Sequence, residues 1–329
     1  MKKNELTLIT GGTGFIGKRI ADKFAEAGIP MRFLVRDPSK LPKNLRSVEI
    51  VIGDITDYKI VSKAVAGVEK VIHLVTVYPT QGKDICFKVN IEGTLNLLKA
   101  SLENKITHFV HFSTTGVMGN LKKIPANEES PLLYASDDPY ESSKAEAEQL
   151  VNEYGKKGLP VTILRPASVY GPGDLRLLKF FKMIVQKKFF YLGSGNNHMH
   201  FVHVDDVARA VEKVFEHPEK SIGEIFIIAG DEILTMRQVC EIVAKEAGVP
   251  APLIRLPFMP FYLAGYLCEA ICHPLKINPP IYRSRVRFFI NDRGFSTSKI
   301  EKNIGYKPMF SNKAGLKETT RDYLDKGLI

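Results

Sequence analysis

The first half of the chain alternates short apolar runs with segments whose apolar residues recur every three or four positions. Apolar runs bounded by glycine and polar residues predict buried strands, and the three-to-four spacing predicts helices. The expected strands cover residues 6–9, 31–35, 48–52, 70–74, 108–112 and 161–164. The expected helices cover residues 18–27, 57–65, 84–103 and 139–156. Apolar strands that alternate with helices form parallel sheets covered on both faces, so we expect an α/β fold with a doubly wound, Rossmann-type sheet.

Beyond Pro166 the alternation becomes less regular. The pattern there predicts two further strands, several helices and a proline-rich apolar region. These segments are strands at 201–204 and 225–228, helices at 205–215 and 235–247, the apolar region at 256–272 and two short terminal helices. We therefore expect a dinucleotide-binding domain over residues 1–170 and a smaller, interleaved C-terminal substrate lobe over residues 171–329. Some segments of this lobe are expected to return to the Rossmann sheet.

A glycine-rich turn, Thr10-Gly11-Gly12-Thr13-Gly14-Phe15-Ile16-Gly17, joins the first expected strand to the first expected helix. Gly11 allows a sharp turn, Gly14 allows the backbone to approach a pyrophosphate, and Gly17 allows the helix to lie close to the sheet. The helix N-terminus then offers N–H groups and a partial positive charge to phosphates. The turn predicts nucleotide binding.

Composition limits the class of protein. The 329 residues are 44% hydrophobic and 25% charged, as in ordinary globular proteins, and the net charge is +10. The charge is compatible with an anionic ligand, weak attraction to acidic membrane surfaces, or nucleic acid, but the lysines are scattered, which favours a solvated basic surface without nucleic-acid binding. The four cysteines lack the spacing of a zinc site and are expected to be reduced thiols in a cytoplasmic protein without a signal peptide. The apolar run 256–272 is too short to span a bilayer, although it is expected to form a sticky surface.

Tyr140 and Lys144 lie four positions apart on an expected helix and therefore share one face. A lysine beside a phenol favours the phenolate and is expected to lower the pKa of the tyrosine. Such a tyrosine can exchange a proton with a carbonyl oxygen while a hydride moves.

The combination of these motifs resembles the extended branch of the short-chain dehydrogenase/reductase superfamily, the NAD-dependent epimerase/dehydratase type. The resemblance covers nearly the whole chain. The matching segments are 10–17, Gly53-Asp54, His73-Leu74, 90–94, 113–119, 165–173 and 203–208. It implies an enzyme with a small-molecule substrate and suggests a homodimer formed through the helix that carries Tyr140.

The resemblance also implies residue roles. Thr114 would hydrogen-bond the substrate oxygen, Tyr140 would act as acid or base, and Lys144 would hold the nicotinamide ribose; Ser113 and Thr115 compete for the role of Thr114. The residues expected to bind the cofactor are Gly11, Thr13, Gly14, Phe15, Ile16, Gly17, Arg36, Asp54, Ile55, Leu74, Asn90, Tyr140, Lys144 and Pro166.

The cofactor choice depends on the end of the second expected strand. Arg36 lies near the position where an acidic residue would bind the ribose hydroxyl of NAD, and a guanidinium there suits the 2′-phosphate of NADP. Asp37 follows directly, so NADP is favoured and NAD stays open.

The substrate is less well defined. Where family members that act on nucleotide-sugars carry an arginine, this chain has Met199 and His200, and Met118 replaces the family's tyrosine. We therefore expect a secondary alcohol or ketone, as in dihydroflavonol reductases and 3β-hydroxysteroid dehydrogenases, with a nucleotide-sugar epimerase or dehydratase as the alternative. A non-catalytic dinucleotide sensor is a second alternative. His198, His200 and His203 lie on a strand that would alternate their faces, so no metal site is expected.

Overall fold

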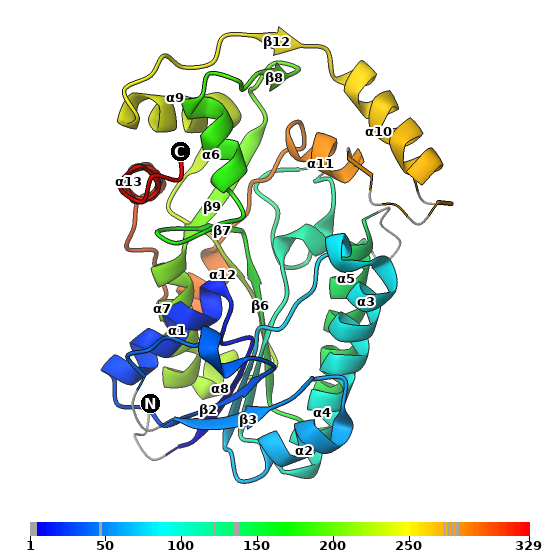
Figure 1. Ribbon diagram of the computed structural model, residues 1–329. Coiled ribbons are helices and arrows are strands. Elements are labelled where there is room, and N and C mark those ends of the chain that lie inside the picture. Colours follow the sequence, from blue (N-terminus) through cyan, green and yellow to red (C-terminus); the bar gives the residue numbers. More distant parts are fainter. Residues whose placement is uncertain are drawn as a thin grey trace.

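The computed structural model describes residues 5–45, 48–121, 123–133, 138–272, 274–275, 277, 279–280 and 283–329. Within these residues, seven parallel strands form the main sheet in the order β10-β6-β5-β4-β1-β2-β3 (Figure 1). The strands are β1 (Thr7–Thr10), β2 (Met31–Val35), β3 (Glu49–Ile52), β4 (Lys70–His73), β5 (His108–Phe112), β6 (Val161–Pro166) and β10 (Ile225–Ile228). The expected doubly wound α/β fold is confirmed.

Helices cover both faces of this sheet, and each face has its own apolar core. One face carries α2 (Tyr58–Val65), α3 (Lys83–Phe87), α4 (Thr94–Glu103) and α5 (Pro139–Lys156). The other carries α1 (Phe15–Glu26), α7 (Val204–Glu216), α8 (Pro218–Ser221) and α12 (Ser298–Ile304). Because both faces are covered, strands β1, β4 and β5 are buried along their whole length.

The second half of the chain adds a lobe with a third apolar core. Its helices are α6 (Leu178–Val185), α9 (Met236–Glu246) and α13 (Asn312–Asp325). Its strands are β7 (Ser168–Tyr170), β9 (His198–His203) and β11 (Ile233–Thr235) in one small sheet, and β8 (Tyr191–Leu192) and β12 (Arg255–Leu256) in another. Two further helices, α10 (Phe258–Cys272) and α11 (Arg283–Phe288), pack against each other at the periphery (Figure 1). Strand β10 belongs to the main sheet although it lies in the second half of the chain, and the boundary at residue 170 stays a prediction.

The differences from the expected elements have local causes. The single helix expected over 84–103 is α3 and α4 joined by a π-helical stretch, Lys88–Gly93, which carries Asn90. The apolar region at 256–272 contains helix α10, because Pro260 falls in the first turn, where a missing N–H costs no helical hydrogen bond. In the described part of the chain, no helix has both the length and the apolar character needed to cross a bilayer.

Candidate active site

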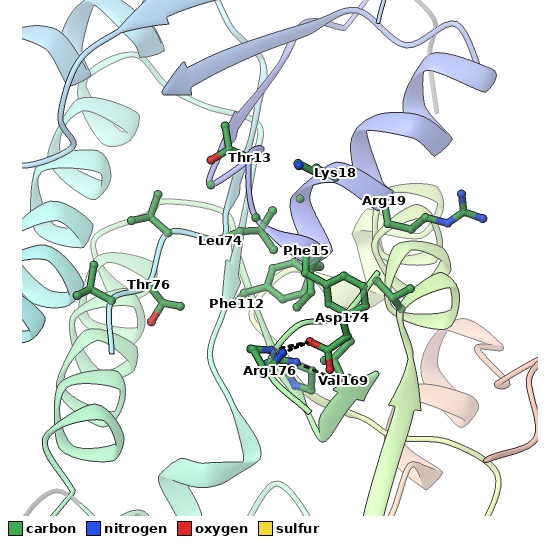
Figure 2. Close-up of a pocket in the computed structure, with 18 of the residues that line it drawn as sticks. Thr13, Phe15, Lys18, Arg19, Leu74, Thr76, Phe112, Val169, Asp174 and Arg176 are labelled. Atoms are coloured by element: carbon green, nitrogen blue, oxygen red, sulfur yellow. Dashed lines mark hydrogen bonds and ion pairs between the residues drawn. The ribbon is translucent and has the colours of Figure 1, made fainter. Parts of the chain in front are cut away.

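A cavity of about 1010 Å³ opens at the carboxyl ends of β1 and β4, where the strand order reverses. Figure 2 shows residues from distant parts of the chain that line it, including Thr13, Leu74, Phe112 and Arg176. The cavity is lined by all of the predicted site residues but one: Gly11, Thr13, Gly14, Phe15, Ile16, Gly17, Arg36, Asp54, Ile55, Leu74, Thr114, Tyr140, Lys144 and Pro166. The exception is Asn90.

Asn90 supports the site from behind. Its side chain is buried, and its Oδ1 accepts a hydrogen bond from the backbone N–H of Val77 at 2.8 Å. Its Nδ2 donates to the Val77 carbonyl at 3.0 Å and to the Ser143 Oγ at 2.9 Å. Asn90 therefore ties the loop after β4 to helix α5, and its contact with the cofactor stays a prediction.

The glycine turn leaves no room for a side chain at Gly11 or Gly17. Gly11 has φ +78°, and a Cβ on it would lie 2.9 Å from the backbone of Leu74. A Cβ on Gly17 would lie 2.3 Å from the Gly11 carbonyl oxygen, so only glycine lets α1 begin this close to the turn. Gly14 is the N-cap of α1 and supplies no side-chain cap, so the start of α1 faces the cavity without a competing side chain. This cradle has the shape that a dinucleotide pyrophosphate requires.

Arg36 and Asp37 at the end of β2 face different partners. Arg36 lines the cavity, its side chain is 71% exposed, and its guanidinium lies 3.9 Å from the Asp54 carboxylate. The Asp37 carboxylate accepts hydrogen bonds from the backbone N–H and hydroxyl of Ser39, at 3.1 and 2.6 Å, and lies 3.3 Å from the Lys40 ammonium. The Ser39 hydroxyl, followed by Lys40, lowers the pKa of Asp37. Asp37 is thus occupied in its own turn, whereas Arg36 stands at the cavity.

Helix α5 brings the predicted acid–base residues together at the end of β5. The Asp138 carboxylate caps this helix by accepting from the Tyr140 N–H at 2.9 Å, and Pro139 suits its first turn. The Lys144 ammonium is buried and donates to the Phe112 carbonyl at 2.6 Å. The Thr114 side chain lines the cavity together with the Tyr140 phenol and opposes the rise of the Tyr140 pKa. The neighbouring hydroxyl of Ser113 donates instead to the buried Glu148 carboxylate, at 2.6 Å.

The predicted lowering of the Tyr140 pKa was wrong. Burial raises the pKa of Tyr140 well above its usual value, and Tyr78 adds to the increase, while Arg176 and Thr114 oppose it. Burial also lowers the pKa of Lys144 to about 8. The sequence placed both residues on one helical face, but it did not reveal that both are desolvated and that the ammonium binds a strand-end carbonyl. The result is a neutral phenol able to donate its proton.

Two side chains that the sequence did not single out complete this part of the cavity. The Tyr78 ring stacks on the Tyr140 ring with centroids 4.7 Å apart. Arg176 donates to the Tyr78 hydroxyl at 3.3 Å and to the Val169 carbonyl at 2.7 Å, and the Asp174 carboxylate holds its Nε at 3.3 Å (Figure 2). The only sequence signals were that Tyr78 follows the end of a strand and that Arg176 follows the Gly171-Pro172-Gly173 turn. Together they restrain the Tyr140 ring and keep a cation beside it.

A buried ion pair anchors helix α5 from below. Glu148, fully buried, lies one turn beyond Lys144 and pairs with Arg165 of β6, which is 2% exposed. Arg165 also donates to the Glu128 carbonyl at 3.0 Å. Glu148 thereby joins α5 to the ends of β5 and β6, which fixes the helix that carries Tyr140 and Lys144.

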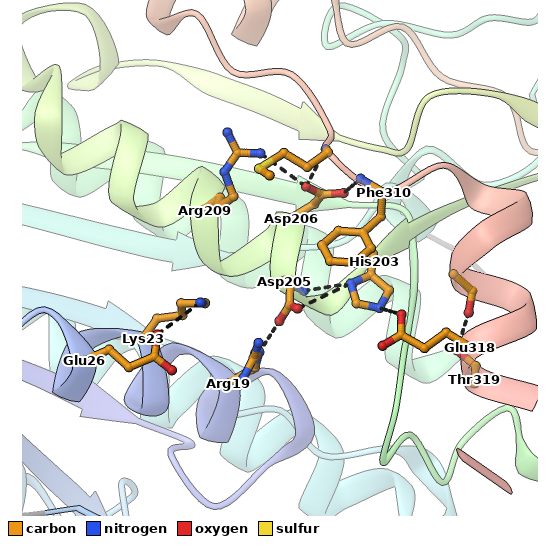
Figure 3. A network of polar contacts seen from close by, with 12 residues as sticks. Arg19, Lys23, Glu26, His203, Asp205, Asp206, Arg209, Phe310, Glu318 and Thr319 are labelled. Atoms are coloured by element: carbon orange, nitrogen blue, oxygen red, sulfur yellow. Dashed lines mark hydrogen bonds and ion pairs between the residues drawn. The ribbon is translucent and has the colours of Figure 1, made fainter. Parts of the chain in front are cut away.

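A second polar network closes the cavity on the side of the C-terminal lobe (Figure 3). Arg19 of α1 pairs with Asp205 of α7, and His203 lies 3.6 Å from the Glu318 carboxylate of α13. Burial lowers the pKa of His203 to about 4, so the ring is neutral and accepts from the Asp205 N–H. The network links the helix of the glycine turn to the lobe.

The other two histidines of this strand have separate partners. His198 Nδ1 lies 2.8 Å from the Asp292 carboxylate, and His200 Nε2 lies 3.1 Å from the Gly230 carbonyl. Across the described ranges, His, Cys, Asp and Glu side chains form no group of three able to hold a metal ion.

Comparison with known proteins agrees with this geometry. The 3-beta-hydroxysteroid dehydrogenase of Mycolicibacterium neoaurum is 26% identical over 97% of this chain and 91% of its own length. The 2-alkyl-3-oxoalkanoate reductase of Stenotrophomonas maltophilia is 28% identical over 94% of this chain and 97% of its own length.

A solved structure and a family description also match this chain. The dTDP-glucose 4,6-dehydratase DesIV of Streptomyces venezuelae, solved with NAD bound, superposes with a TM-score of 0.77 at 25% identity, covering 97% of both chains. Residues 7–229 match the description "NAD dependent epimerase/dehydratase family". The chain therefore belongs to the NAD-dependent epimerase/dehydratase family, within the extended short-chain dehydrogenase/reductase superfamily.

Proposed function

We propose that this protein is an NADP-dependent oxidoreductase that interconverts a secondary alcohol and a ketone. The observation that carries the proposal is the Tyr140 phenol, whose ring stacks on Tyr78 and which shares one cavity with Thr114 and the glycine cradle. A neutral phenol is the group that a carbonyl oxygen needs as proton donor during reduction.

The proposed roles follow from the contacts. A dinucleotide held by the glycine turn would supply the hydride for the carbonyl carbon. Tyr140 gives its hydroxyl proton to the carbonyl oxygen, which becomes the alcohol oxygen, and Thr114 donates a hydrogen bond that orients this oxygen. The Lys144 ammonium, held by the Phe112 carbonyl, stabilises the phenolate left on Tyr140. Arg176 contributes a second positive charge that favours the same phenolate.

The residues at the end of β2 support NADP over NAD. Arg36 stands at the cavity with a largely exposed guanidinium, and Asp37 is engaged by Ser39 and Lys40. A 2′-phosphate would find a cation there, whereas the carboxylate that would bind ribose hydroxyls is turned to its own loop.

The relatives support an apolar ketone or alcohol as the substrate. One is named as a hydroxysteroid dehydrogenase and another as a reductase of alkyl-oxoalkanoates. Apolar side chains also line the cavity, among them Val77, Phe112, Val169 and Leu175. They would accept a hydrocarbon skeleton more readily than a sugar.

A substrate screen tests the proposal against the epimerase or dehydratase alternative. The purified protein is offered NADPH or NADH with a 3-oxosteroid, a 2-alkyl-3-oxoalkanoate, UDP-glucose or dTDP-glucose. We expect consumption of NADPH with one or both ketones and no turnover of the sugars. Turnover of a nucleotide-sugar without net change in the cofactor would support the alternative instead. Cofactor binding without turnover of any of the four compounds would favour the non-catalytic sensor.

We also propose a cytoplasmic homodimer. The four cysteines are free thiols, which suits a reducing compartment. The dimer rests on the family resemblance. Light scattering during gel filtration gives the oligomeric state, and a monomer mass would remove this part of the proposal.

A further inference from the structure

Helix α10 exposes a continuous apolar stripe. Its exposed side chains are spaced three or four positions apart and therefore share one face. Apart from Pro260, which is also exposed, they are Met259, Leu263, Tyr266, Leu267, Ala270 and Ile271. The large ones are each 53–62% exposed. Four more large apolar side chains are exposed just before and just after the helix in the chain, namely Leu253, Ile254, Leu275 and Ile277. In the described chain, about half of the large exposed apolar residues lie between positions 253 and 277.

The opposite face of α10 is attached to the protein. Phe261 packs against Phe190, with ring centroids 5.4 Å apart. Glu269 accepts hydrogen bonds from the Arg283 backbone N–H at 2.7 Å and from its Nε at 2.6 Å. Gly265 is buried against Arg283, since a Cβ on it would lie 3.3 Å from the Arg283 nitrogen. These contacts fix the helix so that its apolar stripe points outward, at the edge of the molecule seen in Figure 1.

The stretch of sequence that contains α10 is basic. Between residues 249 and 291 the sequence holds five basic residues, Arg255, Lys276, Arg283, Arg285 and Arg287, and a single acidic residue, Glu269. The Glu269 carboxylate is only 12% exposed and is paired with Arg283. Lys187 and Lys188 are also exposed, just before strand β8, which pairs with β12 directly ahead of α10. An apolar face in a basic stretch of chain, with exposed lysines before the neighbouring strand, is complementary to an anionic bilayer surface.

The dimensions favour a bilayer over a second copy of the chain. Fifteen helical residues extend about 22 Å, and a stripe about 10 Å wide gives the helix by itself an area far below the ~800 Å² that each partner of a stable dimer buries. An interfacial helix needs only to insert its apolar side chains ~5–10 Å into the boundary between headgroups and acyl chains. We infer that α10 docks this protein on the surface of membranes that contain anionic lipid, without spanning them.

Vesicle sedimentation tests this inference on the full-length protein. Sucrose-loaded vesicles of phosphatidylcholine alone are compared with vesicles that contain about 30% phosphatidylglycerol. We expect binding to the anionic vesicles to be at least about tenfold tighter, and raising the salt from about 0.1 M to about 0.5 M should weaken it. The double variant Leu267→Glu/Ile271→Glu should weaken binding at least about tenfold, because two exposed apolar side chains are replaced by carboxylates.

A matched control separates the stripe from net charge. Ile222 and Met309 are 40% and 70% exposed and lie outside α10. The variant Ile222→Glu/Met309→Glu carries the same charge change and should retain most of the vesicle binding. Both double variants should keep the wild-type circular dichroism and NADPH affinity, because the substituted side chains are exposed and distant from the glycine turn in sequence.

Three results would overturn the inference. The first is wild-type protein that stays in the supernatant with both vesicle types. The second is an equal loss of vesicle binding in the two double variants. The third is a change from dimer to monomer in Leu267→Glu/Ile271→Glu without vesicle binding by the wild type, which would assign the stripe to a second copy.

Discussion

Strand β5 and helix α10 are both rich in apolar side chains, yet they differ in what surrounds them. All five residues of β5 are buried, because helices cover both faces of the sheet. In α10 Gly265 is the buried residue, and within the described residues α11 and Phe190 pack against one face of the helix. The comparison shows that apolar composition favours removal of a segment from water. Whether the segment is buried inside the protein depends on which elements pack against it.

The two regions also treat polar groups differently. The ends of β5 and β6 bury Lys144, Glu148 and Arg165, each held by specific partners. Burying charged groups is unfavourable unless they are paired, so such a cluster is typical of a site where chemistry requires it. Helix α10 contains one charged side chain, Glu269, and offers apolar surface instead. Chemistry is thus assigned to the sheet ends and docking to α10, and the following substitutions test that division.

The largest expected effect is on turnover. Tyr140→Phe keeps the stacking on Tyr78 and removes only the transferable proton, so kcat should fall about 10²–10⁴-fold with little change in NADPH affinity. Tyr78→Phe keeps the same stacking, and its kcat should fall by less than about tenfold. Leu267→Glu/Ile271→Glu in α10 should leave kcat for a water-soluble ketone unchanged. Near-normal turnover by Tyr140→Phe would assign the proton to another group.

The next effect is on stability. Glu148→Ala leaves the buried Arg165 guanidinium without its carboxylate, and the free energy of unfolding should drop by about 3–5 kcal/mol. Glu269→Ala, which removes the partly exposed pair of α10, should cost about 1 kcal/mol. Urea denaturation followed by circular dichroism measures both. Equal losses would contradict the difference in burial between the two regions.

Cofactor preference is the third test. Arg36→Ala should weaken NADPH binding about 10- to 150-fold and leave NADH nearly unchanged, since charge-assisted hydrogen bonds contribute about 1.5–3 kcal/mol. Asp37→Ala should affect neither cofactor strongly, because its carboxylate is held by Ser39 and Lys40. Fluorescence titration gives the dissociation constants. An equal loss for both cofactors in Arg36→Ala would refute the NADP proposal.

The smallest effect concerns acid stability. His111 in β5 is buried, and within the described residues neither of its ring nitrogens has a hydrogen-bond partner. Burial, followed by the Lys144 charge, lowers the pKa of His111 well below its usual value. Below about pH 6.5 the unfolded chain therefore binds a proton that the native chain does not, and the free energy of unfolding falls as the pH falls.

At about pH 5 this contribution is about 2 kcal/mol for a histidine that stays neutral in the native state. His111→Leu should remove it, so the loss of stability between about pH 7 and 5 should shrink by that amount. Urea denaturation at the two pH values measures the difference. The same pH dependence in wild type and His111→Leu would show that this ring does not resist protonation.

The sequence predicted those parts of the molecule whose structure is local. The glycine turn, the end of β5 with Thr114, and the Tyr140–Lys144 face depend on short-range spacing, and the structure brings them to one cavity. The contacts of Asn90, Glu148 and Tyr78 depend on which distant segments meet. No periodicity in one segment reveals that Glu148 will meet Arg165 or that Tyr78 will stack on Tyr140.

The α10 segment was harder to predict for a different reason. Its prolines, Pro257 and Pro260, suggested an irregular region, but the first precedes the helix and the second lies in its first turn. The sequence did indicate an apolar, adhesive surface there. Which side chains are exposed depends on the packing of one helical face against α11 and Phe190.

Hydride transfer from labelled cofactor tests the proposed reaction most directly. The enzyme is given a ketone substrate with NADPH deuterated on the face of C4 that the enzyme uses, and the product is analysed by mass spectrometry. An oxidoreductase places the deuterium on the new carbinol carbon, with one NADPH oxidised for each alcohol formed. The proposal predicts this product for wild type and a loss of its formation in Tyr140→Phe. Deuterium that stays on the cofactor while a nucleotide-sugar is converted would contradict it.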